Sequence, residues 1–428
     1  MPAGVKTAAV WLLRLATGAT FVVSGWAKCT DPWGFVIKIQ EYLAVWGWQG
    51  VPRDAVLVGA VALSVLELVT GVALATGSLR RSTPVCGLAM MAVMLPLTVY
   101  IYAADPVADC GCFGDFLIIS NGATLAKNIV LTAALALLLV WHGAARPLLR
   151  PSLQWLALAI AGVYGLTLAV LGWQFQPTAD FRPYPAGSQL ISEESTAGAD
   201  VPEYVYSKGG REERFALDSL PDSTWTFVRQ AAPTAAQHEG LAVFDGDEEV
   251  TDEVLDEGAR GDMMILVVNN PGIEYLTRAR LTNEINAALE ARGGRMIGLV
   301  AASGDALEQW IELARPDFEV YSASDTSLKE LARGDAALVA VRDGRILWKN
   351  SLATIDPAIV KAASPLDAVT VYDDGRVATW LTLSALICLA FLTAIDYMTR
   401  RRATRRRAGN KTEENDRQQS HIAADLRH

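Results

Sequence analysis

Six long apolar runs constrain the fold of this 428-residue chain more than any other feature of its sequence. Each run is about 20 residues long, the length that a helix needs to cross the hydrocarbon core of a bilayer. Because lipid offers no partner for backbone N–H and C=O groups, each run is predicted to be a helix. The runs are residues 8–27, 55–77, 84–104, 124–141, 153–173 and 378–398. The sequence therefore predicts an integral, multi-pass membrane protein in contact with the lipid bilayer.

Basic residues near the ends of these runs predict the orientation, since cytoplasmic loops are rich in Lys and Arg. If the runs cross the membrane in alternation, one side carries Lys6, Arg80, Arg81, Arg146, Arg150 and the arginine-rich run at 400–407. We expect that side to be the cytoplasm, with both termini on it. The polar residues 174–377 then lie outside, in the periplasm if the chain sits in a bacterial inner membrane. One segment departs from the rule, because residues 28–54 fall outside yet carry three basic residues.

The charge balance argues against nucleic acid as a partner. The formal net charge is −10, and the basic residues gather in the run RRRATRRR at 400–407, directly after the last apolar run. A basic segment in that place is typical of the cytoplasmic flank of a membrane span. A nucleic-acid-binding domain needs a basic surface of its own. We therefore expect no nucleic-acid partner.

The segment DPWGFVIKIQEYLAVWGW at 31–48 is too short and too polar to span a bilayer. Its apolar residues Phe35, Ile39, Tyr42 and Trp46 recur at helical spacing, which predicts a helix. Such a helix lies either in the membrane interface or packed against the bundle, and the pattern leaves both open.

The polar region after the fifth run is predicted to contain an α/β domain. The stretch EYVYSKGGREERFAL reads as a β-hairpin. From residue 262 apolar strands alternate with helical segments, the first of which is a single helix over EYLTRARLTNEINAALEARGG, and a last hairpin follows around Arg-Asp-Gly-Arg. Asp305 is predicted to cap one of these helices. The order β-α-β-α-β-α-β-β resembles the thioredoxin fold. However, no cysteine lies between Cys112 and Cys388, so the Cys-x-x-Cys of thioredoxins is absent and a binding or docking module is expected.

The chain is thus predicted to be a membrane α-helical bundle, with a four-helix core and two further spans, joined to an α/β thioredoxin-like domain outside the membrane. The predicted divisions are the four-span domain 1–150, the fifth helix 151–176, a linker and β-rich segment 177–260, the α/β domain 261–365, the sixth helix 378–398 and a basic cytoplasmic tail 399–428.

Two cysteines, Cys110 and Cys112, flank a single glycine in the loop PVADCGCFGD between the third and fourth runs. With Cys29, which lies just past the outer end of the first run, they fall on the oxidising side of the predicted topology. A disulfide across one residue closes a very small ring, which favours a labile redox bond over a structural brace. Inert free thiols remain an alternative. A metal clip is a third, which the lack of nearby histidines weakens, so no metal site is expected.

Glu67 lies midway along the second run, where a carboxylate is costly and should have a partner. Lys28, Lys127 and Asn128 are the candidates. The carboxylate either handles protons next to a quinone or disulfide, or it makes a structural hydrogen bond between helices. Asp115 and Lys127 are also candidates for an ordinary loop ion pair.

Several motifs together resemble the DoxX/MauE family of small membrane proteins. They are GWAKCTDP after the first run, LEL in the second, and PVADCGCFGD followed by LAKN at the start of the fourth, within roughly residues 8–141. The segment DFRPYPAG and the α/β region resemble a branch that carries an exported thioredoxin-like region without its cysteines. In the family, MauE is implicated in maturing the disulfide-rich subunit of methylamine dehydrogenase, and DoxX-type proteins are linked to quinone-coupled oxidation. The resemblance thus implies a redox role for Cys110 and Cys112.

Two hypotheses for the function follow. In the first, the bundle passes electrons from exported thiols to a membrane acceptor such as a quinone, with Cys110, Cys112 and Cys29 as redox residues and Glu67, Lys127 and Asn128 near the cofactor. In the second, the chain is a non-enzymatic membrane anchor or assembly factor whose outer module binds an envelope protein. A transporter fits less well, because the sequence shows a single clear intramembrane ionisable residue and no inverted repeat.

Overall fold

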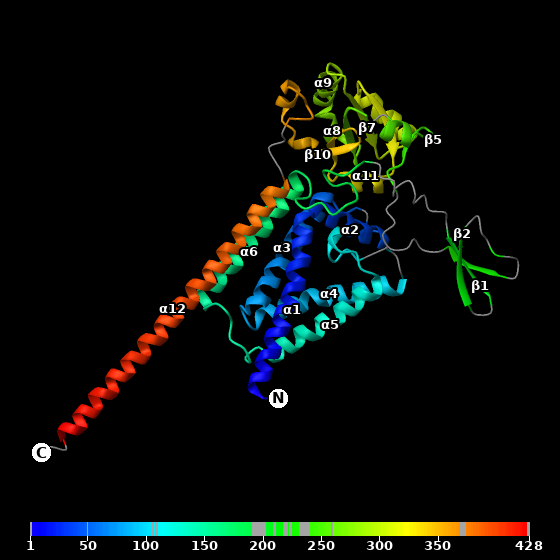
Figure 1. Cartoon of the computed structure of the whole chain (residues 1–428). Helices are drawn as coiled ribbons and strands as arrows, with labels where there is room; N and C mark the ends of the chain where they lie inside the picture. The colour runs from blue at the N-terminus through cyan, green and yellow to red at the C-terminus, as the bar shows by residue number, and fades with distance from the viewer. Residues whose placement is uncertain are drawn as a thin grey trace.

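The computed structural model of the chain consists of a helical bundle with an α/β domain at one end of it (Figure 1). The N-terminus and the C-terminal end of the last helix lie at the other end of the bundle. The structure describes residues 2–48, 50–104, 107, 110–190, 203–208, 211–216, 221, 225–230, 240–257, 260–368 and 374–425.

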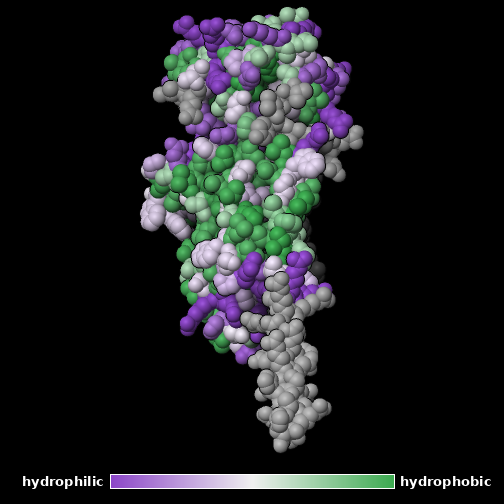
Figure 2. Space-filling model, turned by 90° about the vertical axis from the view of Figure 1, so that its left-hand side faces the viewer, coloured by the Kyte–Doolittle hydropathy of each residue, from purple (hydrophilic) through white to green (hydrophobic). Residues whose placement is uncertain are grey.

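Every predicted apolar run forms a helix. Within the described residues, six helices are long and apolar enough to cross a membrane, which confirms the predicted spans. Figure 2 shows a hydrophobic band across this face of the bundle between two hydrophilic ends, as expected for a surface in contact with lipid. The helices are α1 (Ala3–Thr30), α3 (Arg53–Thr76), α4 (Ser82–Ala104), α5 (Asn121–Val140), α6 (Pro151–Gln174) and α12 (Asp374–Asp425).

Helices α1 and α3 form the closest pair in the bundle, and glycines make this approach possible. A Cβ atom at Gly25 of α1 would lie 2.4 Å from the backbone nitrogen of Leu68, and one at Gly71 of α3 would lie 2.5 Å from that of Val22. Small residues at such crossings let helix backbones approach closely in membranes. Helices α4 and α5 form a second pair, and α6 packs on α1 and α3 with α12 beside it.

The short helix α2 (Pro32–Val45) fills the connection between α1 and α3. Its buried residues Trp33 and Val36 pack on α3, and the Trp33 indole donates a hydrogen bond to the Trp173 carbonyl at 3.0 Å. The helix predicted at 31–48 is therefore present and packed against the bundle. That it also lies in the membrane interface remains a prediction.

The α/β domain is built on a seven-stranded mixed sheet with the order β10-β9-β6-β7-β8-β4-β5. Strands β6, β7 and β8 are parallel, while β9 pairs antiparallel with β6 and with β10. The mixed sheet is as predicted, and the thioredoxin-like description of it remains a prediction. The strands are β4 (Val243–Asp245), β5 (Glu248–Glu249), β6 (Asp262–Val268), β7 (Arg295–Val300), β8 (Glu319–Ala323), β9 (Ala336–Arg342) and β10 (Arg345–Ser351). The connecting helices are α8 (Ile273–Leu276), α9 (Ala279–Glu290), α10 (Asp305–Ala314) and α11 (Asp325–Leu331), with short helical turns η3 (Asp252–Glu257), η4 (Leu352–Thr354) and η5 (Pro357–Lys361).

Two local predictions in this domain differ from the structure. The helix expected after β6 is broken into α8 and α9, because Arg278 at the break donates hydrogen bonds to the carbonyls of Ala353 and Ile355 in the segment after β10. Asp305 is the first residue of α10, and its cap is Gly304, whose φ of 55° suits glycine. The prediction of Asp305 as the N-cap is therefore wrong by one residue.

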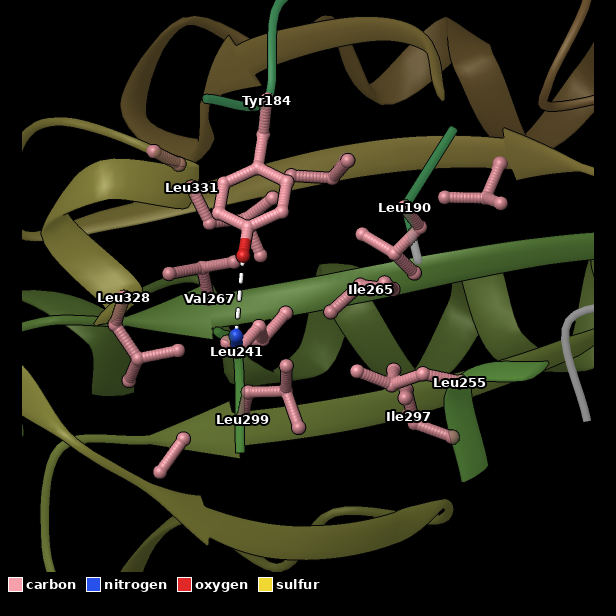
Figure 3. Packing of buried hydrophobic residues seen from close by; sticks show 14 of the residues in the cluster. Tyr184, Leu190, Leu241, Leu255, Ile265, Val267, Ile297, Leu299, Leu328 and Leu331 are labelled. Carbon is pink, nitrogen blue, oxygen red and sulfur yellow. Dashed lines mark hydrogen bonds between the residues drawn. The ribbon is translucent and has the colours of Figure 1, made fainter. Parts of the chain in front are cut away.

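Residues of the predicted linker form part of the core of the α/β domain. Tyr184 and Leu190 are buried among residues of the sheet, and the Tyr184 hydroxyl accepts a hydrogen bond from the Leu241 nitrogen at 3.0 Å (Figure 3). The segment after α6 thus belongs to the folded domain. A separate antiparallel sheet has the order β2-β1-β3 and contains the predicted hairpin. Its strands are β1 (Glu203–Lys208), β2 (Arg211–Ala216) and β3 (Thr226–Gln230).

Candidate functional site around the Cys110–Cys112 disulfide

A disulfide joins Cys110 and Cys112, whose Cα atoms are 5.5 Å apart. The loop turns at Gly111 and Gly114, which have φ values of 64° and 54° that glycine adopts at little cost. Each cysteine is only 7% exposed. The pair packs with Tyr42, Ile101 and Phe113.

Two hydrogen bonds anchor the backbone of the disulfide ring to neighbouring helices. The Tyr42 hydroxyl on α2 donates to the Cys110 carbonyl at 2.9 Å. The Ser24 hydroxyl on α1 lies 2.5 Å from the Cys112 carbonyl. Because Ser24 is buried within the bundle, the ring is tied to the polar interior of the helices.

A buried ion pair lies next to this anchor. Lys28 Nζ is 2.6 Å from Glu67 Oε2, and the two side chains are 5% and 13% exposed. Lys28 was one of the predicted partners of Glu67, and this pairing is confirmed. The Ser24 hydroxyl is 2.6 Å from Glu67 Oε1 and 3.3 Å from Lys28 Nζ, so one serine touches the carboxylate, the ammonium and the disulfide ring.

The Ser24 hydroxyl has more hydrogen-bond acceptors around it than it has protons to donate. A hydroxyl has one proton to donate, yet Ser24 lies within hydrogen-bond distance of two acceptors, the Cys112 carbonyl and Glu67 Oε1. The single Ser24 proton therefore serves one of these two acceptors at a time. The Lys28–Glu67 ion pair and the Ser24 hydroxyl form a continuous polar group that reaches the backbone of Cys112.

Of the two other residues predicted to lie near a cofactor, Lys127 borders the disulfide loop and Asn128 links two helices. Lys127 Nζ lies 4.3 Å from the centre of the Phe113 ring, directly after Cys112, so Lys127 borders the site. Asn128 is buried, and its amide donates to the Thr98 hydroxyl at 3.4 Å, linking α5 to α4.

The third predicted redox residue, Cys29, is packed elsewhere. It is fully buried as a free thiol against Leu68, Leu168 and Ala169 of α3 and α6. The disulfide lies in a different cluster, with residues of α2 and α4. The structure therefore brings Cys110, Cys112, Glu67 and Lys127 together and leaves Cys29 outside the group.

The sequence reasoning missed Arg333, which reaches the site from the α/β domain. Its Nη2 is 2.5 Å from Asp115 Oδ2, three residues after Cys112, and its Nε is 3.0 Å from Asp31 Oδ2. Asp115 therefore pairs with Arg333, and Lys127, its candidate partner in the sequence, lies against Phe113. Burial alone would lower the pKa of Arg333, but Asp31 and Asp115 raise it, so the guanidinium stays charged. No local motif signals this contact, because it joins positions 218 residues apart.

A second ion pair of the same interface runs between Arg53 and Asp335. Arg53 begins α3 and lies 4.3 Å from the centre of the Trp33 ring on α2. Asp335 follows Arg333 closely in the loop between α11 and β9. This pair also joins the two parts of the chain.

A cavity of about 1020 Å³ lies apart from the disulfide, between α1, α12, the segment after α6 and strand β10. The buried Thr178 hydroxyl in its wall has no hydrogen-bond partner among the described residues. None of the predicted site residues lines this cavity.

Comparison with known proteins places this site within a family. Residues 202–232 match a domain of unknown function, DUF8463. No curated protein and no solved structure matches the chain. The family model of the methylamine utilisation protein MauE matches residues 6–142, which run from α1 to the end of α5 and include the disulfide, Lys28, Glu67 and Lys127. Residues 6–142 therefore form a membrane domain of the MauE family, to which DoxX-like membrane proteins are related.

Proposed function

We propose that the MauE-family domain carries out thiol–disulfide exchange, with Cys110 and Cys112 as the redox pair. One observation carries the proposal: Ser24 joins the backbone carbonyl of Cys112 to the buried Lys28–Glu67 pair. A purely structural disulfide has no need of ionisable side chains at this depth, where they are costly. A redox disulfide needs protons at each turnover, and this group supplies a place for them.

The proposed step oxidises an exported client with two thiols. A client thiolate attacks one sulfur of the Cys110–Cys112 bond, which breaks that bond and forms a mixed disulfide. The second client thiol then displaces the remaining bound cysteine. Two electrons and two protons pass from the client to the pair, which leaves a client disulfide and two thiols at positions 110 and 112.

The charged side chains assist the leaving sulfur in this step. Lys28 and Lys127 place positive charge beside the loop, at Ser24 and at Phe113. Positive charge near a cysteine favours its thiolate, which is the form that leaves. Proton exchange with the Lys28–Glu67–Ser24 group then converts the thiolate to a thiol.

Reoxidation of the pair requires an acceptor, and the family resemblance suggests a membrane quinone. The residues predicted to bind it already have partners within the protein. Ser24 and Lys28 donate hydrogen bonds to the two Glu67 oxygens, and the Asn128 amide donates one to the Thr98 hydroxyl. These contacts do not form a quinone cradle, so no step through a quinone is derived.

We place the disulfide on the outer face of a bacterial inner membrane, with both termini in the cytoplasm. Disulfides persist in oxidising compartments, and the basic residues of the chain favour the same orientation. The client is then an exported protein with thiol groups. The α/β domain, in the same orientation, lies outside and serves as its docking module.

Thiol trapping in intact cells tests the proposal. Cells are treated with a membrane-impermeant reductant and then with an alkylating reagent that shifts the mass of the chain. We expect the reductant to open the Cys110–Cys112 disulfide and the reagent to alkylate both thiols. In Cys110→Ser cells we expect the thiols of client proteins to accumulate in their reduced form. Cys388→Ser, which removes an exposed free cysteine from α12, is the matched control and should leave both readouts unchanged. A pair that no external reductant reaches, together with normal clients in Cys110→Ser cells, would sink the proposal.

A second candidate function is that of a non-enzymatic anchor or assembly factor. The low exposure of both cysteines favours it, because residues that are only 7% exposed leave little surface for a client thiol to reach. In that case the α/β domain should retain an envelope partner in pull-downs, and the Cys110→Ser and Cys112→Ser variants should retain it equally well.

A further inference from the structure

Arg333 is the side chain through which the α/β domain contacts the disulfide loop. It lies in the loop between α11 and β9 and is only 7% exposed. Its guanidinium bridges Asp115, in the turn η1 (Gly114–Phe116) after the disulfide, and Asp31, at the junction of α1 and α2. One residue thus joins the sheet domain, the redox loop and the bundle.

The loop that carries Arg333 is held firmly by its own domain and by the segment after α6. The Asn269 amide donates to the carbonyls on both sides of Arg333, those of Ala332 and Gly334, at 2.9 Å each. The Gln176 side chain accepts from the Arg333 nitrogen at 3.0 Å and donates to its carbonyl at 2.9 Å. The guanidinium is therefore presented at a fixed position, and the disulfide loop must bring Asp115 to it.

The disulfide loop is fixed on its other side by aromatic contacts. Phe116, next to Asp115, packs edge-on against Trp26 of α1 at 5.7 Å and against Phe181 at 5.0 Å between ring centres. Opening the ring between Cys110 and Cys112 frees the backbone only a few residues before Asp115. Displacing Asp115 would leave a buried guanidinium with one of its carboxylates missing, which is strongly unfavourable.

We propose that Arg333 is a positioning residue that couples the redox state of the Cys110–Cys112 pair to docking of the α/β domain. The closed ring holds Asp115 at Arg333 and favours the docked domain. Reduction opens the ring, weakens this contact and releases the domain from the loop. Because such coupling is reciprocal, docking in turn favours the disulfide over the dithiol. The inference rests on the proposed function only in requiring that the pair can be reduced.

The test measures the redox equilibrium of the pair in the full chain, purified in lipid nanodiscs and incubated in glutathione buffers of graded potential. Alkylation of free thiols reports the dithiol fraction. Arg333→Gln and Asp115→Asn both break the contact, and each should shift the equilibrium toward the dithiol by about fivefold or more, a typical coupling. Arg280→Gln is the control, because it removes an exposed ion pair with Glu284 within α9 and leaves the docking contacts intact; it should leave the equilibrium unchanged.

The signs of the two shifts separate coupling from simple electrostatics. Arg333→Gln leaves the Asp115 charge unbalanced and by charge alone would favour the disulfide, whereas Asp115→Asn by charge alone would favour the dithiol. Coupling moves both variants in the same direction, so opposite signs overturn it. Hydrogen exchange gives a second readout: amides of the loop around Arg333 should exchange faster in the reduced wild-type chain, and equal exchange also overturns it.

The failures of the two proposals are distinguishable in the same experiment. If no glutathione buffer reduces the wild-type pair, the proposed exchange function fails and the coupling fails with it. If the pair is reduced normally but Arg333→Gln and Asp115→Asn match the wild type, the coupling alone is wrong. Asp115 is partly exposed, so its variant remains informative even if Arg333→Gln does not fold.

Discussion

At the scale of single residues, the site depends on how one buried carboxylate is shared. Glu67 gives one oxygen to Lys28 and the other to Ser24, and Ser24 in turn contacts the disulfide ring. In the proposed function the carboxylate is the general acid or base for the pair, because one hydroxyl separates it from the backbone of Cys112.

Glu67→Gln tests this role. The amide keeps the shape of the side chain but cannot exchange a proton, so the reaction of the pair with dithiothreitol should slow on the order of 100-fold, the low end of general acid–base contributions. Stopped-flow alkylation measures the rate in purified protein. Asn128→Ala is the matched control, because Asn128 bonds to Thr98 rather than to the site, and its rate should equal that of the wild type. Equal slowing in both variants would contradict the assignment.

Lys28 could be predicted as a partner of Glu67 because the sequence shows how deep each residue lies along its membrane helix. The position of Glu67 within a span requires a polar partner, and only a few polar residues occur at that height, so Lys28 was among the candidates. Rotation about the helix axis is harder to predict. Cys29 follows Lys28 directly, yet its side chain packs with α3 and α6 instead of the disulfide. Which face of a helix meets which neighbour depends on packing that a single sequence does not show.

At the scale of elements, the crossing of α1 and α3 sets the geometry of the site. Gly25 follows Ser24 on α1, and Leu68 follows Glu67 on α3, so the closest backbone contact lies directly beside the ionisable group. The distance between the helices therefore determines whether Ser24 and Lys28 reach the carboxylate.

Gly25→Ala should damage both packing and chemistry. The new Cβ would lie 2.4 Å from the Leu68 backbone nitrogen, which cannot move without shifting α3. We expect a loss of about 1–3 kcal/mol in stability, as for other overpacked cores, and slower reaction of the disulfide. Thermal unfolding in detergent, followed by circular dichroism, measures the first effect.

Gly59→Ala is the control for this prediction. It lies on α3 with nothing within 4 Å of its would-be Cβ, so the change should be neutral or slightly stabilising because alanine favours helices. If Gly25→Ala were equally harmless, the close crossing would not be what positions the site.

Elements of regular structure could be predicted from the sequence because each depends on a local pattern. The six apolar runs, the hairpin at β1 and β2 and the strand–helix alternation from β6 onward all lie where they were expected. The break between α8 and α9 could not be predicted, because it depends on Arg278 binding carbonyls about 75 residues further along the chain. The burial of Tyr184 in the core of the sheet could not be predicted either, because it depends on contacts with distant strands and the segment around it is rich in turn residues.

At the scale of the whole molecule, the segment after α6 does more than connect two domains. Asp180 in this segment binds Arg182 at 2.7 Å and Lys349 of β10 at 2.5 Å, and all three side chains are largely buried. Lys349 also donates to the carbonyls of Tyr184 and Leu331. The same segment carries Gln176, which fixes the Arg333 loop against the bundle. A loss of the Asp180 network should therefore loosen the α/β domain at the side where it meets the membrane part.

Acid should break this network in a defined pH range. Burial alone would raise the pKa of Asp180, but the charges of Arg182 and Lys349 more than offset it and hold the pKa well below its ordinary value. A lowered folded pKa means that the stabilisation is fully present above the unfolded value of about 4 and is lost as the pH falls below it. Thermal unfolding of the α/β domain within the full chain, measured from pH 7 to pH 3, should show this decline in the wild type.

Asp180→Asn separates this carboxylate from the other acids of the chain. At pH 7 the variant should be less stable by about 3–5 kcal/mol, because it leaves two buried cations without their counter-charge. Its stability should then fall less steeply than that of the wild type below pH 4, so the difference between the two chains narrows in acid. Asp325→Asn, which removes an exposed pair with Lys329, should cost less than about 1 kcal/mol. A constant difference between Asp180→Asn and the wild type across the whole pH range would mean that Asp180 acts through its shape and hydrogen bonds, and that its charge does not hold the domain together.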